Sequence, residues 1–143
     1  MKWMKDGCIL TDEKEFVDLD AVHAMLSRTY WAKGRPKETV KATIEASLCF
    51  TLLREGRQIG FTRVLSDFAV YAILLDVVVM GDARGQGLGK WMVKSVMEHP
   101  AIASLNKMLW TRDGDDFYSQ AGFSERKDLK LMACGSSGVQ VLP

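Results

Sequence analysis

The chain has 143 residues, of which 48% are hydrophobic, so it suits one domain with a substantial core. Lys and Arg number 19 against 18 Asp and Glu, a net charge of +1. This balance argues against a dedicated nucleic-acid-binding protein, in which basic side chains gather on one face. Three widely spaced cysteines form neither a CxxC pair nor a disulfide framework, which favours a reducing cytoplasm. The longest apolar run, Val70–Met80, is too short to cross a membrane.

The first half of the chain predicts helices between short strands. Cys8–Thr11 is expected to be a strand, and Asp18 is a candidate N-cap for a helix that ends near Ser27. Thr29–Pro36 is predicted to be a loop with two exposed aromatic residues. A second helix is expected over Lys37–Ser47.

From Leu48 the pattern changes to strands. Leu48–Leu53 and Gln58–Leu65 predict an antiparallel hairpin, and Val70–Met80 predicts a strand covered on both faces. An amphipathic helix is then expected over Gly87–His99, because Pro100 would end it.

The last third predicts a strand at Lys107–Thr111, a short helix at Asp115–Ala121 and a final strand at Leu129–Ala133. Residues 1–134 are expected to form one domain, followed by a disordered tail over 135–143. This order of elements predicts an α/β (α+β) fold in which helices cover both faces of a central sheet.

The segment Arg84-Gly85-Gln86-Gly87-Leu88-Gly89-Lys90 lies where the long strand ends and the amphipathic helix begins. A helix start offers unpaired N–H groups to an anion, and glycines let a phosphate approach the backbone. Arg84 and Lys90 add positive charge. We therefore expect a pyrophosphate site; the alternative is a tight turn without a ligand.

Spacing excludes two common phosphate motifs. A P-loop would need glycine in place of Arg84 and Ser or Thr in place of Trp91, and the GxGxxG fingerprint would need glycine in place of Lys90. These mismatches argue against a nucleotide- or nucleic-acid-binding protein that uses this loop for another phosphate.

The segment does match [RQ]xxGx[GA], through Arg84, Gly87 and Gly89, and it resembles the glycine loop of the GNAT acetyltransferases. The sequence FYSQAGF at 117–123 is similar to the FYxxxGF segment of the same superfamily. The two matches cover about the second half of the chain; YWAKGRP at 30–36 is more weakly similar to small bacterial members. The resemblance implies a mixed, mostly antiparallel central sheet flanked by helices.

The resemblance also implies a function: acetyl transfer from acetyl-coenzyme A directly to a primary amine of a small molecule or a protein, without a covalent acyl-enzyme. No His, Cys and Asp cluster has the spacing of metal ligands, so no metal is expected. A homodimer is compatible with the resemblance, whereas a nucleic-acid or membrane partner is not expected. Backbone groups of Val78, Val79 and Met80 would hold the pantetheine, and an N–H near Val79 would stabilise the oxyanion. The pyrophosphate would lie on the amides of Arg84, Gly85, Gln86, Gly87, Leu88, Gly89 and Lys90.

The resemblance makes Tyr118 the candidate acid that protonates the departing thiolate. A tyrosine with a pKa of about 10 is protonated at neutral pH and can donate to a thiolate whose conjugate acid has a pKa near about 8.5. The alternative is that its ring only packs in the core.

The base is where this sequence departs from the superfamily. Many relatives carry Glu or His at the positions of Ile73 or Leu75, which are apolar here. Asp76 is the carboxylate of this strand, although alternation points it to the opposite face. It is either a catalytic base or a structural hydrogen-bond hub, and ordered water or an amine that is already neutral would make a base unnecessary.

The loop after the first helix is the expected acceptor side. Tyr30, Trp31 and Arg35 are the candidate wall, although Trp31 could equally be a core residue. Arg63 is expected either to meet a carboxylate of the substrate or to pair with Asp67. A coenzyme-A-binding module with weak or no catalysis stays open as an alternative function, because Ile73 and Leu75 carry no carboxylate.

Overall fold

A computed structural model describes residues 1–135. The strands are β1 (Lys2–Lys5), β2 (Cys8–Thr11), β3 (Leu48–Arg54), β4 (Arg57–Ser66), β5 (Tyr71–Val79) and β6 (Asn106–Met108). The α-helices are α1 (Leu19–Leu26), α2 (Lys37–Glu45), α3 (Leu88–Met97) and α4 (Asp115–Ser119), and two short 3₁₀ helices cover Lys14–Phe16 and Gly81–Ala83.

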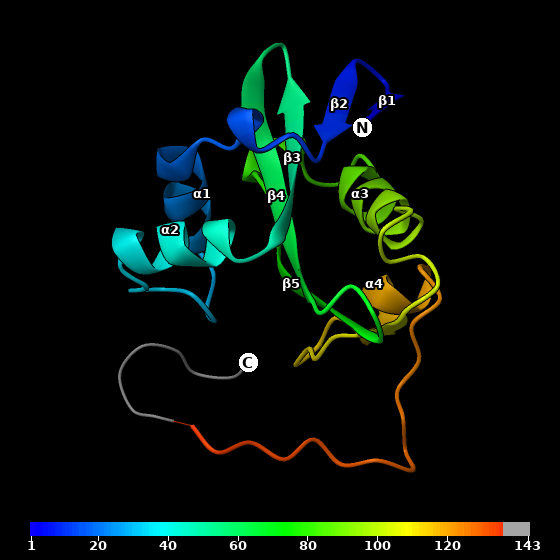
Figure 1. Ribbon diagram of the computed structural model, residues 1–143. Helices are drawn as coiled ribbons and strands as arrows, with labels where there is room; N and C mark the ends of the chain where they lie inside the picture. The colour runs from blue at the N-terminus through cyan, green and yellow to red at the C-terminus, as the bar shows by residue number, and fades with distance from the viewer. Residues whose placement is uncertain (136–143) are drawn as a thin grey trace.

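The six strands form one sheet in the order β1-β2-β3-β4-β5-β6. Neighbouring strands are antiparallel from β1 to β5, and β6 is parallel to β5. The α1–α2 pair lies on one face, while α3 and α4 lie on the other (Figure 1). The expected mixed, mostly antiparallel sheet between helices is therefore confirmed.

Each face of the sheet has its own core. Ala72 and Leu74 of β5 pack with Met92 and Val96 of α3. On the other face, Val22 and Leu26 of α1 pack with Phe61 of β4. These side chains follow the helical and strand periods read from the sequence.

Local signals set the limits of the first two helices. Asp18 Oδ1 accepts a hydrogen bond from the N–H of Ala21 at 3.1 Å, so the predicted N-cap of α1 is confirmed. Pro36 stands immediately before α2, where its fixed φ is compatible with a helix start and its missing N–H costs nothing.

Three expectations need correction. Residues 129–133 are not a strand, because no neighbouring strand of the described chain pairs with them. β5 is not covered on both faces: its odd-numbered side chains are partly exposed, and Tyr71 is half exposed. The N-terminal strand β1 was not expected at all. Most of the predicted tail, residues 136–143, lies outside the described residues.

The sheet opens between β5 and β6. Pairing of these two strands extends only from Tyr71 with Asn106 to Ile73 with Met108, so within residues 1–135 no strand pairs with the later half of β5 on this side. The pairing of β4 with β5 also shifts by one residue at Asp76, whose φ is +53°. Such a bulge bends the strand and increases its twist.

Candidate active site

The loop between β5 and α3 requires glycine at two positions. Gly85 and Gly87 have φ values of +76° and +73°, a left-handed conformation that disfavours any other residue. Gly89 has a different reason: a Cβ there would lie 3.4 Å from the ring of Phe117 on α4. Close helix packing and backbone conformation thus explain the glycines before any ligand is considered.

The start of α3 offers free donors beside this loop. Gly87 is the N-cap and supplies no side-chain hydrogen bond, and the first helical bond runs from the N–H of Trp91 to the carbonyl of Gly87. The amides of Leu88, Gly89 and Lys90 precede that bond, so they point out of the helix start. This arrangement suits an anion such as a diphosphate.

A cavity of about 660 Å³ joins this loop to α4 and to the loop after α1. Its lining includes Gly85 and Gly87 at one end, Tyr118 and Phe117 of α4, and Tyr30. The structure therefore brings residues from these three separate parts of the chain around one space. That space lies at the opening between β5 and β6.

The backbone of Val79 faces the same opening. The N–H of Met80 donates to the carbonyl of Ile59 on β4 at 2.8 Å, and alternation along an antiparallel pair turns the polar groups of Val79 away from β4. Consistent with this, the carbonyl of Val79 accepts a hydrogen bond from Nε of Arg84 at 2.9 Å. A chain entering the opening thus meets the N–H of Val79 and a carbonyl that already accepts a hydrogen bond from Arg84.

Tyr118 lines this cavity and is partly buried. Its ring packs edge-on against Phe117, with centroids 4.9 Å apart, and against Phe123. Burial, with a smaller contribution from the nearby Tyr30, raises the pKa of Tyr118 to about 12. The hydroxyl therefore stays protonated at neutral pH.

Asp76 is the centre of a buried hydrogen-bonded cluster. Its carboxylate accepts from Nε of Arg63 at 2.6 Å, from Nη1 of Arg35 at 3.0 Å and from the indole N–H of Trp31 at 3.1 Å. The side chain of Asp76 is only 3% exposed, and it lines neither of the two cavities described in this section. Of the two roles open for Asp76, these contacts match the hub.

The residues that were expected to bind the acceptor lie in two different environments. Arg35 and Arg63 are buried with Asp76, and the expected pairing of Arg63 with Asp67 is wrong. Tyr30 is half exposed, stacks edge-on against Trp31 and lies under the guanidinium of Arg112 at 3.8 Å. Only Tyr30 and Trp31 of these residues line the cavity.

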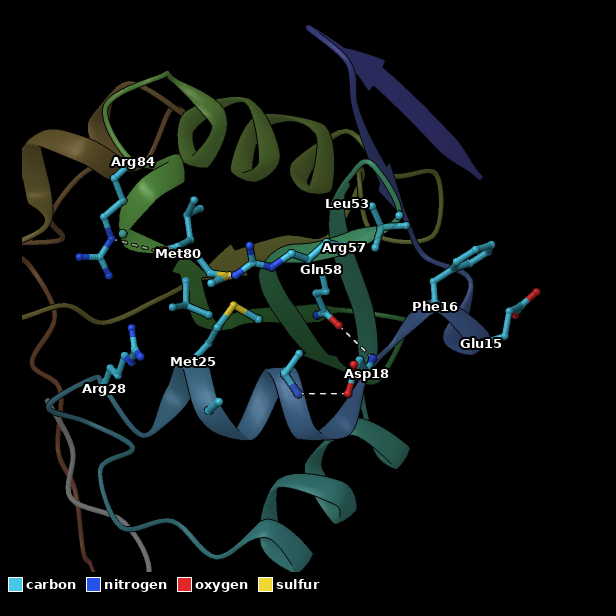
Figure 2. A pocket seen from close by; sticks show the side chains of 16 residues that line it. Glu15, Phe16, Asp18, Met25, Arg28, Leu53, Arg57, Gln58, Met80 and Arg84 are labelled. Atoms are coloured by element: carbon cyan, nitrogen blue, oxygen red, sulfur yellow. Dashed lines mark hydrogen bonds between the residues drawn. The ribbon is translucent and has the colours of Figure 1, made fainter.

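A second cavity, of about 550 Å³, adjoins the first along the outer end of β5 and shares Val78, Val79, Arg28 and Arg84 with it. Figure 2 shows Arg28 at the end of α1 and Arg84 on the loop before α3, both on the left side of this cavity, with Arg57 of β4 nearer its centre. Sequence reasoning missed Arg28 and Arg57, because neither belongs to a motif. Their proximity arises only when α1 packs against the sheet.

Residues 1–135 lack two further kinds of feature. In that range no helix is both long enough and apolar enough to span a membrane. No group of three or more His, Cys, Asp or Glu side chains is arranged to hold a metal ion within the same residues.

Comparison with known proteins agrees with the motifs. The model of the acetyltransferase (GNAT) domain matches residues 45–125. The chain is 30% identical over 115 residues to the uncharacterized N-acetyltransferase ycf52 of Gracilaria tenuistipitata var. liui, a match that covers 76% of this chain and 63% of that protein. The four curated relatives are matched over 63% to 68% of their own lengths.

Solved structures agree as well. A GNAT-family crystal structure from Xanthomonas campestris pv. campestris is 34% identical, with a TM-score of 0.82 over 89% of this chain and 93% of that chain. The ribosomal-protein-S18-alanine N-acetyltransferase of Escherichia coli, at 20% identity and a TM-score of 0.69 over 84% of this chain and 79% of its own, shares the fold. The chain therefore belongs to the GNAT acetyltransferase family.

Proposed function

We propose that this protein is an acetyl-coenzyme-A-dependent N-acetyltransferase that transfers the acetyl group directly to a primary amine of a small molecule or a protein. The observation that carries the proposal is one cavity bordered by the unpaired amides at the start of α3 and by the protonated hydroxyl of Tyr118. Acetyl-coenzyme A would supply an activated thioester. The name of the Gracilaria relative supports nitrogen as the acceptor atom.

The part of the cavity lined by the loop between β5 and α3 would fit the diphosphate of coenzyme A, and the end of β5 would lie along its pantetheine arm. Residues Arg84 to Lys90 would bind the diphosphate through amides and side-chain charge, in line with the conformation of Gly85 and Gly87. Backbone groups of Val78, Val79 and Met80 would hold the arm, and the N–H of Val79 would stabilise negative charge on the thioester oxygen; the position of Val78 and Val79 in the lining of both cavities supports this role.

Tyr118 is the proposed general acid. Its raised pKa keeps the hydroxyl protonated at neutral pH, so it would donate a hydrogen bond to the sulfur as the C–S bond breaks. Because the thiol has the lower pKa, complete proton transfer from Tyr118 to the thiolate is uphill, and water would supply the proton that ends on the thiol. Asp76 is proposed to position rather than to accept a proton, since two guanidinium groups and an indole already occupy its oxygens. In this proposal the amine arrives neutral or loses its proton to water.

The acceptor is proposed to enter beside Tyr30 and Trp31, which line the cavity opposite the glycine loop. The acceptor roles expected for Arg35 and Arg63 find no support in their buried pairing with Asp76. Both arginines are proposed instead to hold the bulge of β5 and Trp31 in place.

The test is release of free thiol from acetyl-coenzyme A in the presence of polyamines, amino acids, aminoglycosides and peptides, with binding of acetyl-coenzyme A measured by calorimetry. Binding together with amine-dependent thiol release is the expected result. Tight binding without turnover on any amine, unchanged by Tyr118→Phe, would instead indicate the coenzyme-A-binding module. Absence of binding would overturn both functions.

A further inference from the structure

The second cavity, of about 550 Å³, opens beside the proposed site of acetyl transfer. Val79, whose N–H would stabilise the thioester oxygen, lines both cavities, and so does Arg28 in the turn after α1. α1 forms one wall through Ala21, Ala24 and Met25, which with Arg28 follow the i, i+3, i+4, i+7 spacing of a single helix face. The alanine side chains are small, so a molecule that reaches Val79 can extend along α1.

Three arginine side chains line this cavity without a partner of opposite charge. Arg28, Arg57 and Arg84 form no ion pair within residues 1–135, and all three are exposed. Nε of Arg84 donates to the carbonyl of Val79 at 2.9 Å, and Nη2 of Arg57 lies 3.9 Å from Sδ of Met80. Neither contact neutralises a charge, so these guanidinium groups are available to an anion.

The carboxylates of this cavity lie at its other end. Figure 2 shows Glu15 and Asp18 near the start of α1, on the side away from Arg28 and Arg84. Asp18 already serves as the N-cap of α1, because its carboxylate accepts from the N–H of Ala21. The end that adjoins the first cavity is therefore positively charged and suits an anion.

Positive charge at this end also selects among amines. Arg28 and Arg84 would repel an ammonium group, and the same charges favour the neutral amine, which is the form that attacks a thioester. An acceptor with an anionic group of its own would bind in spite of this repulsion, because a guanidinium stabilises the anion. A polyamine carries only positive charge and has no such compensation.

We propose that the acceptor is a small amine with a carboxylate or phosphate close to its amino group, and that Arg28 binds this anion while the rest of the acceptor lies in the second cavity. The forked N–H donors of a guanidinium match both anions. Arg57, nearer the centre of the cavity, adds to its positive charge (Figure 2). Transfer forms the C–N bond of an amide and breaks the C–S bond of the thioester, while the nitrogen loses a proton to water and the thiol gains one from water. This inference rests on the proposed function and names its substrate class.

The first test compares matched amines at saturating acetyl-coenzyme A by release of free thiol. Each amino acid is paired with its carboxamide, and O-phosphoethanolamine is paired with ethanolamine, so the two arms separate carboxylate from phosphate. In at least one pair, the member with the anion is expected to have a kcat/KM about 10-fold to 100-fold higher than its partner, the factor that a hydrogen bond to a charged group supplies.

The second test is Arg28→Gln, which removes the charge and keeps a polar side chain. It should lower kcat/KM for the anionic amine by about 10-fold to 100-fold, without changing kcat/KM for its partner or the Kd for acetyl-coenzyme A. Arg126→Gln is the matched control, because Arg126 is an exposed arginine that lines neither cavity, and it should leave all three values unchanged. Circular dichroism verifies that each variant is folded.

The remaining outcomes separate this inference from the proposed function. Equal kcat/KM for both members of every pair, turnover of peptides alone, or equal losses on both members in Arg28→Gln would overturn the inference and leave the proposed function standing. A higher Kd for acetyl-coenzyme A in Arg28→Gln would also overturn it, because Arg28 would then bind the coenzyme. Absence of thiol release with every amine would overturn both.

Discussion

Nε of Arg63 on β4 lies 2.6 Å from Oδ2 of Asp76 on β5, and both side chains are buried. The contact sits where the register of the two strands shifts and where Asp76 adopts a φ of +53°. A positive φ costs free energy in a residue other than glycine, so it persists only where the surrounding contacts hold the residue in that conformation. The ion pair, with Arg35 and Trp31 on the same carboxylate, supplies that restraint and ties the loop after α1 to the bulge.

Asp76→Asn should lower the free energy of unfolding by about 3–5 kcal/mol, because it leaves two buried guanidinium groups without their counter-charge. Denaturant unfolding followed by fluorescence measures this. The control is Asp128→Asn: Asp128 also pairs with an arginine, Arg126, at 2.6 Å, but on the surface, and its loss should not shift the midpoint measurably. Equal effects of the two substitutions would contradict the buried restraint.

Gly87→Glu should abolish binding of acetyl-coenzyme A, since it strains a left-handed residue and brings a carboxylate to the amides of the proposed diphosphate site. Calorimetric titration measures the loss. Gly7→Glu is the control, because Gly7 has nearly the same φ, +75°, in the turn between β1 and β2, away from both cavities. Both substitutions should destabilise the fold by about 1–2 kcal/mol, and only the first should affect binding. Normal binding by Gly87→Glu would place the diphosphate elsewhere.

Tyr118→Phe should lower kcat by roughly 10²–10⁴-fold while the Kd for acetyl-coenzyme A stays the same, because the ring is kept and only the proton donor is lost. Tyr71→Phe, at an exposed tyrosine of β5, controls for removal of a hydroxyl. An equal loss in kcat and in affinity would instead indicate a packing role.

The pKa of Tyr118 makes a separate prediction about pH. Since burial raises that pKa from 10.0 to about 12, the acid stays protonated until pH passes well above 10, and kcat should show no alkaline decrease from this group below that pH. A decrease near pH 8 that disappears in Tyr118→Phe would contradict this assignment.

Asp67→Asn should alter the acid sensitivity of the fold. The N–H groups of Tyr71, Val70 and Ala69 donate to the carboxylate of Asp67 and lower its pKa from 3.8 to about 2. Because the folded-state pKa is depressed, this stabilisation is present above pH 3.8 and is lost as pH falls through about 2. Between these pH values the melting temperature should fall less in Asp67→Asn than in the parent. If the melting temperature fell equally with pH in both proteins, the hydrogen bonds to Asp67 would not contribute to stability.

The family and the fold class could be predicted from the sequence because their signals are local. Gly87 and Gly89 stand at fixed distances from Arg84, and helix and strand periods are read within a few residues. The strand expected at 129–133 failed for the same reason: alternation shows that a segment can be a strand, but only a neighbouring strand with a free edge makes it one.

The sequence by itself determined the glycine loop and the order of the main elements, since short-range spacing and backbone preference carry that information. The resemblance of the FYSQAGF segment made Tyr118 the candidate acid, which stays a prediction. Only the tertiary structure decided that Asp76 meets Arg35, Arg63 and Trp31, because these residues are 13 to 45 positions apart and meet only when α1 and α2 pack on the sheet. A buried charge is stable only when it is paired. The groups that can pair with it are set by how distant segments of the chain pack together, which local sequence patterns do not reveal.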